Sequence, residues 1–289
     1  MRAGFSGVSY HDSDRGRVPQ QVDCHCGRKE CTGRMGNSLG VFYPESRFGG
    51  FTDVDGTIAF YIRVNALLKS TGVVLDVGCG RGAWQDDPVP VRRQLRDLRG
   101  KCGKVIGIDV DPAGASNPFL EEFRLIEGPA WPVPDDSIDL CVCDSVLEHI
   151  TEGEAFFDQF ARVLRPGGFL CIRTSNKLSY VALLARLIPD RFHASVLQRA
   201  CQGRTQEKDV FPTLYRCNTT RRLKSLLSHR GFEHCVCGYD AEPSYLALWR
   251  TAYRAGMICS RVMPGMFKST LFAFARRISG ARAGSEQRP

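Results

Sequence analysis

A short apolar run that leads directly into a cluster of glycines constrains this chain more than any other feature of its sequence. Residues 73–77 (VVLDV) predict a buried strand, residues 78–82 (GCGRG) follow at once, and a stretch rich in Arg and Leu to about residue 99 predicts a helix. A second predicted strand, residues 104–109 (KVIGID), ends in the carboxylate of Asp109. A glycine-rich turn lets backbone approach a ligand closely, and an acid at the tip of the next strand can accept hydrogen bonds from both ribose hydroxyls. This order of residues therefore indicates a site for a nucleoside-type cofactor.

The rest of the chain alternates between strand and helix patterns. The later predicted strands lie at 123–127, 138–143, 169–174, 233–238 and 267–277. The predicted helices besides the one after the glycines lie at 56–68, 152–164, 218–230 and 244–262. Strands that alternate with helices predict an α/β fold built on a doubly wound, mostly parallel sheet of seven strands.

The composition fits one large domain. The chain has 289 residues, of which 43% are apolar and 24% charged, and this excludes a wholly disordered or collagen-like chain. Residues 1–34 show no periodicity and predict a poorly ordered leader before a domain over 35–289. Within that domain, we expect 56–176 to form the cofactor-binding core and 177–289 to supply a mainly helical substrate-binding elaboration and the final strands.

The 13 cysteines bear on compartment and on metal binding. Their number is odd, the chain opens without a secretory signal pattern, and no run of 18 apolar residues occurs, so we expect a cytoplasmic protein with reduced thiols. Cys24, His25, Cys26 and Cys31 could ligate zinc, but the spacing differs from paired knuckles and no second pair follows. We therefore expect no metal site.

Four ordered motifs carry a family resemblance. The glycine cluster lacks the full dinucleotide spacing and the Lys-Ser/Thr of a phosphate loop, and taken alone it is compatible with a bare structural turn. The four motifs are VLDVGCGRG (74–82), VIGIDVDP (105–112), WPVPDDSIDLCVCDSVLEHI (131–150) and FARVLRPGGFLCIRTSN (160–176). Together they resemble the motifs of class I S-adenosylmethionine-dependent methyltransferases, in the small-molecule branch called type 11. The match covers 56–176 strongly and the remainder in outline, and it implies a Rossmann-like methyltransferase fold.

The resemblance also implies which residues hold S-adenosylmethionine. Asp76, Gly78, Cys79 and Gly80 would surround the methionine moiety, Asp109 would hold the ribose, Val110 would flank the adenine, and Asp144 would lie by the methionine amino end. Many relatives carry Gly-Asp before the third motif, whereas this chain has Gly128-Pro129-Ala130. Adenine recognition would then use the backbone of Ala130 or Trp131, or cofactor affinity would be weakened. Extra residues at 86–90 are expected to form a loop over the cofactor.

Methyl transfer from a sulfonium requires an aligned acceptor and, for a hydroxyl acceptor, a base within reach. His149 is the candidate base, because histidine titrates near neutral pH and the resemblance places this residue at the mouth of the acceptor pocket. A purely structural role for His149 at the start of the following helix is the alternative. The candidate contacts to the acceptor are Arg204, Asp209, Tyr215 and Arg216. The alternative is that these four residues only hold a lid segment in place.

The charge distribution and the pattern of residues 244–262 bear on partners. Residues 36–170 carry 13 basic and 20 acidic groups, whereas residues 171–289 carry 20 basic and 7 acidic groups. The basic last third of the chain therefore indicates either an anionic partner or a basic face exposed to solvent. Arg250, Arg254 and Arg261 form a basic stripe on the predicted helix, a pattern compatible with peripheral contact at an anionic inner membrane surface or with ordinary packing. The sequence contains no recognisable RNA-binding module, so we do not expect a nucleic-acid partner.

The sequence thus predicts a methyltransferase that methylates a small molecule, with a hydroxyl of a sugar or glycan as the favoured acceptor. C-methylation of a quinone-type or lipid precursor, with an apolar tunnel built from 244–277, is an alternative within the same family. A non-catalytic cofactor-binding scaffold, motivated by Pro129, is the alternative of another class.

Overall fold

The computed structural model describes residues 35–180, 213–243, 246 and 250–278. The chain divides into two units, Met1–Gly33 and Arg34–Pro289, and every described residue belongs to the second. Among the described residues, no helix has both the length and the apolarity needed to cross a membrane.

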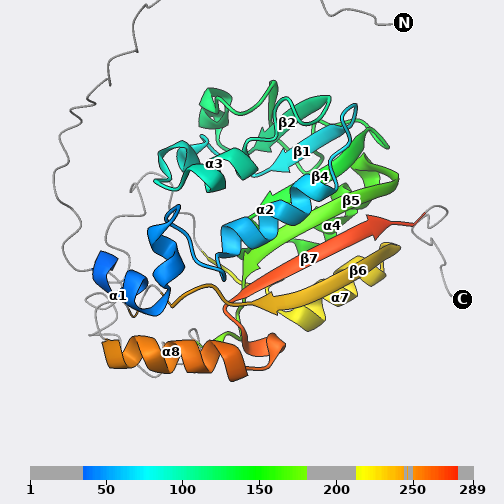
Figure 1. The fold of residues 1–289 in the computed structure, drawn as a ribbon. Helices are drawn as coiled ribbons and strands as arrows, with labels where there is room; N and C mark the ends of the chain where they lie inside the picture. Colours follow the sequence, from blue (N-terminus) through cyan, green and yellow to red (C-terminus); the bar gives the residue numbers. More distant parts are fainter. Residues whose placement is uncertain (1–34, 181–212, 244–245, 247–249, 279–289) are drawn as a thin grey trace, which may run out of the picture. The chain divides into compact units, whose positions relative to one another are not determined.

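The centre of the fold is a sheet of seven strands in the order β3-β2-β1-β4-β5-β7-β6 (Figure 1). The strands are β1 Val73–Val77, β2 Lys104–Asp109, β3 Glu122–Leu125, β4 Ile138–Asp144, β5 Leu164–Ser175, β6 Phe232–Tyr239 and β7 Thr270–Arg277. Strand β7 runs antiparallel to the other six strands, which are parallel to one another. The sheet order reverses between β1 and β4, which is where open α/β sheets bind ligands beyond the carboxyl ends of their strands. The predicted doubly wound, mostly parallel sheet is confirmed.

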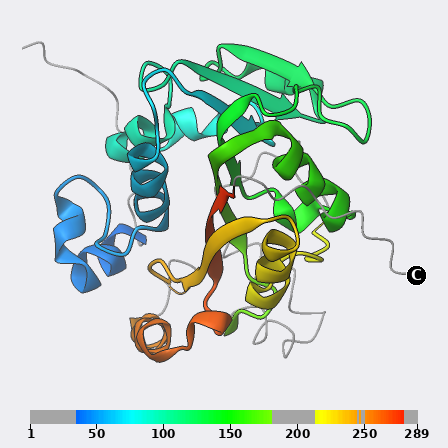
Figure 2. The same cartoon turned by 90° about the vertical axis from the view of Figure 1, so that its right-hand side faces the viewer.

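Helices cover both faces of the sheet (Figures 1 and 2). The described helices are α1 Met35–Phe42, α2 Gly56–Ala66, α3 Pro90–Arg96, α4 Gly153–Val163, α7 Thr220–Ser228 and α8 Arg250–Val262. Phe60 and Val64 of α2 join one core cluster with the sheet, and Phe157 of α4 and Leu223 of α7 join another, so the sheet separates two apolar layers. All four side chains are fully buried, so each contributes to the apolar stabilisation of the domain.

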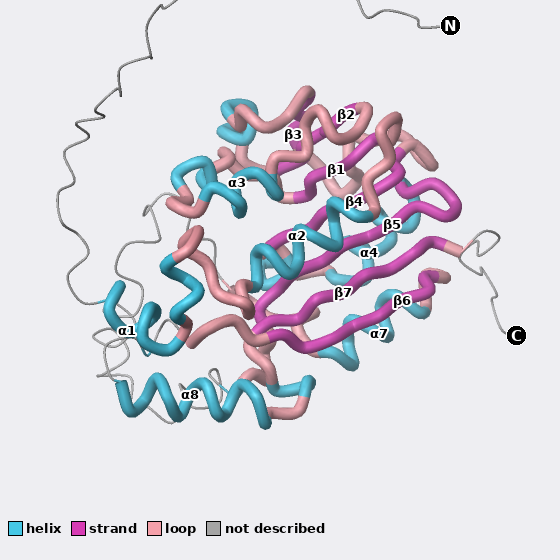
Figure 3. Tube along the Cα trace, in the orientation of Figure 1, coloured by secondary structure: helices cyan, strands magenta, loops and turns pink. Residues whose placement is uncertain are grey.

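Two predicted elements differ most from the structure, and the ends of several others are shifted by one to three residues. The helix expected between the glycines and residue 99 is divided into a 3₁₀ turn, Ala83–Asp86, and the short helix α3, because Pro88 and Pro90 interrupt the helical hydrogen bonding. The strand predicted at 169–174 is longer in the structure, because β5 begins at Leu164 opposite Ile138 and passes a register irregularity before regular pairing. Figure 3 shows β5 between β4 and β7.

Candidate functional site

The glycine-rich turn lies at the carboxyl end of β1, where it is closely packed at Gly78 and open at Gly80. Gly78 has a φ of +70°, and a Cβ added there would lie 2.4 Å from Cγ2 of Val146, just past β4. Gly80 has a φ of +51°, but a Cβ there would meet no atom within 4 Å. The turn therefore needs glycine for its backbone conformation, and it leaves open space at Gly80 into which a ligand can fit.

Asp109 lies at the tip of β2 beside this space. Its Oδ2 accepts a hydrogen bond from the Gly80 amide at 2.9 Å, and its Oδ1 accepts one from the Asp111 amide at 2.9 Å. Each carboxylate oxygen keeps further accepting capacity for a donor such as a ribose hydroxyl. Val110, next in the chain, is 61% exposed and offers an apolar surface for a flat ring. The open space and this acceptor pair fit the adenosine part of the expected cofactor.

Cys79 and Trp131, two predicted cofactor contacts, are largely buried. Burial raises the pKa of the Cys79 thiol, and the backbone of this residue already has partners: its amide donates to the Ile108 carbonyl, and its carbonyl accepts from Nδ2 of Asn117 at 3.0 Å. The Trp131 amide donates to Oε1 of Gln159 at 3.1 Å, and its carbonyl accepts from Nη2 of Arg162 at 3.0 Å. Its ring packs edge-on against Phe160. Ala130 is exposed, so of the two predicted adenine contacts it has the more accessible backbone.

Asp144, at the end of β4, belongs to a buried ion network. Its oxygens accept two hydrogen bonds of 2.6 Å from Nε and Nη2 of Arg173 in β5, and one of 3.2 Å from Nη2 of Arg96 in α3. The Tyr61 hydroxyl donates to it at 3.1 Å. Burial alone would raise the pKa of Asp144, but the two guanidinium groups outweigh this effect and hold the pKa well below its usual range. Asp144 is therefore an anion that already has strong partners within the protein.

Asp76, in β1, lies next to this network and has a different electrostatic environment. Desolvation, followed by the nearby charges of Asp144 and Asp109, raises the pKa of Asp76 to about 7, although Arg96 opposes this shift. Within the described part of the chain Asp76 forms no ion pair. It is a carboxyl group that an incoming cation would stabilise in its charged form.

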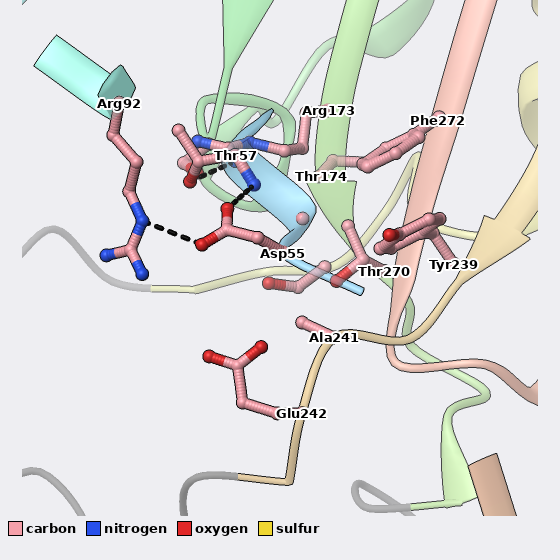
Figure 4. Close-up of a pocket in the computed structure, with 13 residues that line it drawn as sticks. Asp55, Thr57, Arg92, Arg173, Thr174, Tyr239, Ala241, Glu242, Thr270 and Phe272 are labelled. Carbon is pink, nitrogen blue, oxygen red and sulfur yellow. Dashed lines mark hydrogen bonds and ion pairs between the residues drawn. The ribbon is translucent and has the colours of Figure 1, made fainter. Parts of the chain in front are cut away.

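A pocket of about 240 Å³ opens beside the donor region, at the carboxyl ends of β4 and β5 (Figure 4). Ser145 lines it, and the next residue, Val146, is the one that contacts Gly78, so the pocket adjoins the glycine-rich turn. Its other walls come from the start of α2, from α3, from β5–β7 and from the residues after β6. They are Asp55, Gly56, Thr57, Arg92, Arg173, Thr174, Ser175, Tyr239, Ala241, Glu242, Thr270 and Phe272.

Most charged groups of the pocket are already paired, and Glu242 is the exception among its lining residues. Asp55 accepts from Nε of Arg92 at 2.7 Å, and Nη1 of Arg173 donates to the Thr57 hydroxyl at 2.9 Å. Glu242 accepts from the Thr52 hydroxyl at 3.1 Å, and burial raises the pKa of its carboxyl group.

One wall of the pocket is aromatic. The Tyr239 ring stacks on Phe272 with centroids 4.7 Å apart. Burial, Asp55 and Glu242 raise the pKa of Tyr239 to about 12, so its hydroxyl stays protonated. The pocket therefore offers a flat aromatic surface, a hydrogen-bond donor and one carboxyl group without a cationic partner.

His149 lies at the end of a short 3₁₀ turn, Leu147–His149, and is half-buried. It is not among the residues that line the pocket. Tyr215 has a φ of +52°, and its amide donates to the carbonyl of Glu148, while Arg216 is exposed at the surface near Glu152. Arg204 and Asp209 lie outside the described residues.

The structure adds Arg96, Arg173, Tyr239 and Glu242 to the residues that the sequence predicts for the site. Arg173 follows the fourth motif, but no local pattern distinguishes any of the four from ordinary surface or core residues. The described residues contain no group of His, Cys, Asp or Glu that could hold a metal ion, and the cluster at Cys24–Cys31 lies outside them.

Several known proteins are similar to this chain. Residues 56–236, more than half of the chain, match a family model described as a methyltransferase domain. The chain is 32% identical over 111 residues to a probable S-adenosylmethionine-dependent methyltransferase of Mycolicibacterium smegmatis, covering 37% of this chain and 39% of the relative. It is 31% identical over 114 residues to the ubiquinone biosynthesis O-methyltransferase of Rhizobium johnstonii, covering 39% and 44%.

The matched stretch thus spans about two fifths of the length of these curated relatives. Among solved structures, a SAM-dependent methyltransferase from Aquifex aeolicus aligns with a TM-score of 0.44 at 16% identity, over 84% of this chain and 98% of that chain.

Proposed function

Because this chain belongs to the methyltransferase-domain family, we propose that it transfers the methyl group of S-adenosylmethionine to a hydroxyl group of a small molecule. The observation that carries the proposal is the adjacency of two spaces. The glycine-rich turn and Asp109 border a space suited to adenosine, and Ser145 and Val146 lie between that turn and the pocket. A donor and an acceptor bound there would lie side by side beyond β1, β4 and β5.

The bound cofactor supplies an electrophilic methyl group on a sulfonium. The protein's own residues then have three tasks: to bind both molecules, to align them and to exclude water. Gly78 and Gly80 shape the donor space, and Asp109 offers acceptors for two hydroxyls. Transfer from a bound cofactor would remove a positive charge from its sulfur, so the protein would need no group to stabilise a developing anion there.

The pocket favours an acceptor with one hydroxylated ring. An apolar cavity of about 150 Å³ is large enough for benzene, and this pocket measures about 240 Å³. The stacked Tyr239 ring suits the flat face of a sugar or an aromatic ring, and Glu242 and the Tyr239 hydroxyl suit ring hydroxyls. We propose a sugar or glycan hydroxyl as the acceptor.

Two residues are candidates for the base that removes the hydroxyl proton. His149 is the sequence candidate, and Glu242 is the candidate from the pocket. The geometry favours Glu242, because it lines the pocket and burial raises the pKa of its carboxyl group, which makes the carboxylate a stronger base.

The test is transfer of a labelled methyl group from S-adenosylmethionine to a panel of free hexoses, short oligosaccharides and dihydroxybenzenes, with the methylated atom located by NMR. We expect an O-methyl ether. Glu242→Gln should lower kcat about 100-fold or more, while His149→Gln keeps most activity. The opposite pattern would assign the base to His149, and a product methylated at carbon would contradict O-methylation.

A quinone-type precursor is the second acceptor class. It is motivated by the relative named a ubiquinone biosynthesis O-methyltransferase. For such an acceptor the same pocket would hold only the ring, and C-methylation of that ring is the alternative reaction. If wild-type protein binds neither S-adenosylmethionine nor its demethylated product, S-adenosylhomocysteine, the non-catalytic scaffold becomes the better account.

We also propose that α8 contacts an anionic membrane surface at the cytoplasmic side. Ile258 and Val262 are 61% and 72% exposed, and the exposed Arg254 and Arg261 lie on the same side of the helix by their spacing. Co-sedimentation with vesicles should rise when phosphatidylglycerol replaces part of the phosphatidylcholine, and Ile258→Asp should reduce it. Equal binding to both kinds of vesicle would contradict this contact.

A further inference from the structure

Arg96 is the last residue of α3, in the segment that separates the glycine-rich turn from β2. Its guanidinium reaches Asp144 at the end of β4, and its Cζ lies 5.4 Å from the ring centroid of Tyr61 and 5.9 Å from that of Trp84. The side chain is 20% exposed. Arg96 is therefore held between the glycine-rich turn and the tip of β4, beside the donor space.

The hydrogen bonding of Arg96 is incomplete. Its Nε is buried, and among the described residues it has no acceptor. The bond from Nη2 to Asp144 is 3.2 Å long, whereas Arg173 makes two bonds of 2.6 Å to the same carboxylate. A guanidinium has five N–H donors, and a buried donor without an acceptor costs free energy. Arg96 thus has donors available for an additional anion.

The charges around Arg96 indicate what kind of ligand would complete the site. Asp144 and Arg173 form a close bidentate pair and largely neutralise each other. This leaves Arg96 with one longer bond to Asp144 and an Nε that has no acceptor, and it leaves Asp76 without an ion pair among the described residues. A ligand end that carries a carboxylate and an ammonium on the same carbon matches this pair.

We propose that Arg96 binds the carboxylate of the methionine end of S-adenosylmethionine, while Asp76 faces its ammonium group. The proposal rests on the proposed function, since it assumes that the cofactor occupies the donor space. It assigns a binding role to the segment between Gly82 and β2. Pro88 and Pro90 prevent this segment from forming one regular helix, and the separate helix α3 places Arg96 next to Asp144.

The test compares two ligands that differ only in the amino-acid end. S-adenosylhomocysteine has that end, and 5′-methylthioadenosine lacks it but keeps the adenosine and the sulfur. We expect Arg96→Gln to weaken S-adenosylhomocysteine binding about 30-fold or more, and to change the affinity for 5′-methylthioadenosine less than twofold. Arg96→Lys, which keeps the charge, should recover part of the lost affinity.

Arg99→Gln is the matched control, because Arg99 lies in the same connection but pairs with Asp97 at the surface. It should leave both affinities unchanged. Three results would overturn the assignment: Arg96→Gln binds S-adenosylhomocysteine as tightly as wild type, binds it more tightly, or loses affinity for both ligands equally. If wild-type protein binds neither ligand, the proposed donor site is refuted, and the role proposed for Arg96 is refuted with it.

Discussion

The raised pKa of Asp76 links the protonation of this residue to cofactor binding. Desolvation and neighbouring carboxylates raise the pKa of Asp76 to about 7, so near pH 7 the group is only partly charged. An ammonium group bound beside it would favour the charged form and lower that pKa. The folded protein would then release protons on binding near neutral pH, and affinity would fall as the pH drops below about 7.

Calorimetry of S-adenosylhomocysteine binding in buffers of different ionisation enthalpy measures this release. We expect a release of a fraction of a proton at pH 7 and an affinity that falls by at most about tenfold per pH unit below the pKa of Asp76. Asp76→Asn should remove the proton release. Affinity that stays constant between pH 5.5 and 8 would contradict the placement of Asp76 beside the ammonium.

Gly78 and Gly80 have similar backbone conformations but different surroundings, so their substitution should have different effects. A Cβ at Gly78 would collide with Val146, whereas a Cβ at Gly80 would project into open space. Gly78→Ala should lower the free energy of unfolding by about 1–3 kcal/mol. Gly80→Ala should lower the free energy of unfolding less than Gly78→Ala does, but it should weaken the binding of S-adenosylhomocysteine more. Urea unfolding and titration of both variants distinguish these effects, and equal stability losses would argue against the collision.

At the scale of single elements, Asp55 determines how α2 begins. Its Oδ1 accepts from the amides of Thr57 and Ile58, and its Oδ2 accepts from Nε of Arg92 at 2.7 Å. Asp55→Ala removes a helix cap, worth about 1 kcal/mol. It also leaves the largely buried Arg92 with a single ion pair among the described residues, a 3.4 Å contact to Asp87. We expect a total loss of about 2–4 kcal/mol.

Thr219→Ala is the control for this prediction, because Thr219 caps α7 through one bond to the Arg222 amide and holds no cation. Thr219→Ala should lower the free energy of unfolding, measured in urea, by about 1 kcal/mol. Asp55→Asn should fall between the two, since it keeps an oxygen for the cap but loses the charge. If Asp55→Ala costs no more than Thr219→Ala, Arg92 does not depend on Asp55.

The strands could be predicted because each is marked by a pattern of neighbouring residues in the sequence. Residues 73–77 and 104–109 are short apolar runs with clear ends, and both strands have these bounds in the structure. The sequence did not predict the path of residues 83–96, because the prolines compete with a helical apolar pattern and tertiary contacts decide where the helix resumes. Arg96 and Glu242 could not be assigned for a related reason: each joins the site through contacts with residues far away in the chain.

At the scale of the whole molecule, the sheet order explains how distant segments form one site. The reversal between β1 and β4 brings the glycine-rich turn, Asp109 and Asp144 to one edge. The antiparallel strand β7 then places Thr270 and Phe272 next to the end of β5, and β6 delivers Tyr239 and Glu242 to the same edge. Donor recognition therefore depends on the first half of the chain, and the acceptor pocket depends on both halves.

The central claim is that this edge binds S-adenosylmethionine through Asp109. The most direct measurement is calorimetric titration of S-adenosylmethionine and S-adenosylhomocysteine into wild-type protein and Asp109→Ala, with Asp135→Ala as an exposed carboxylate control. We predict micromolar binding for wild type and the control, and a loss of about 30-fold or more for Asp109→Ala. Absence of binding to wild type, or equal binding to Asp109→Ala, would contradict the account.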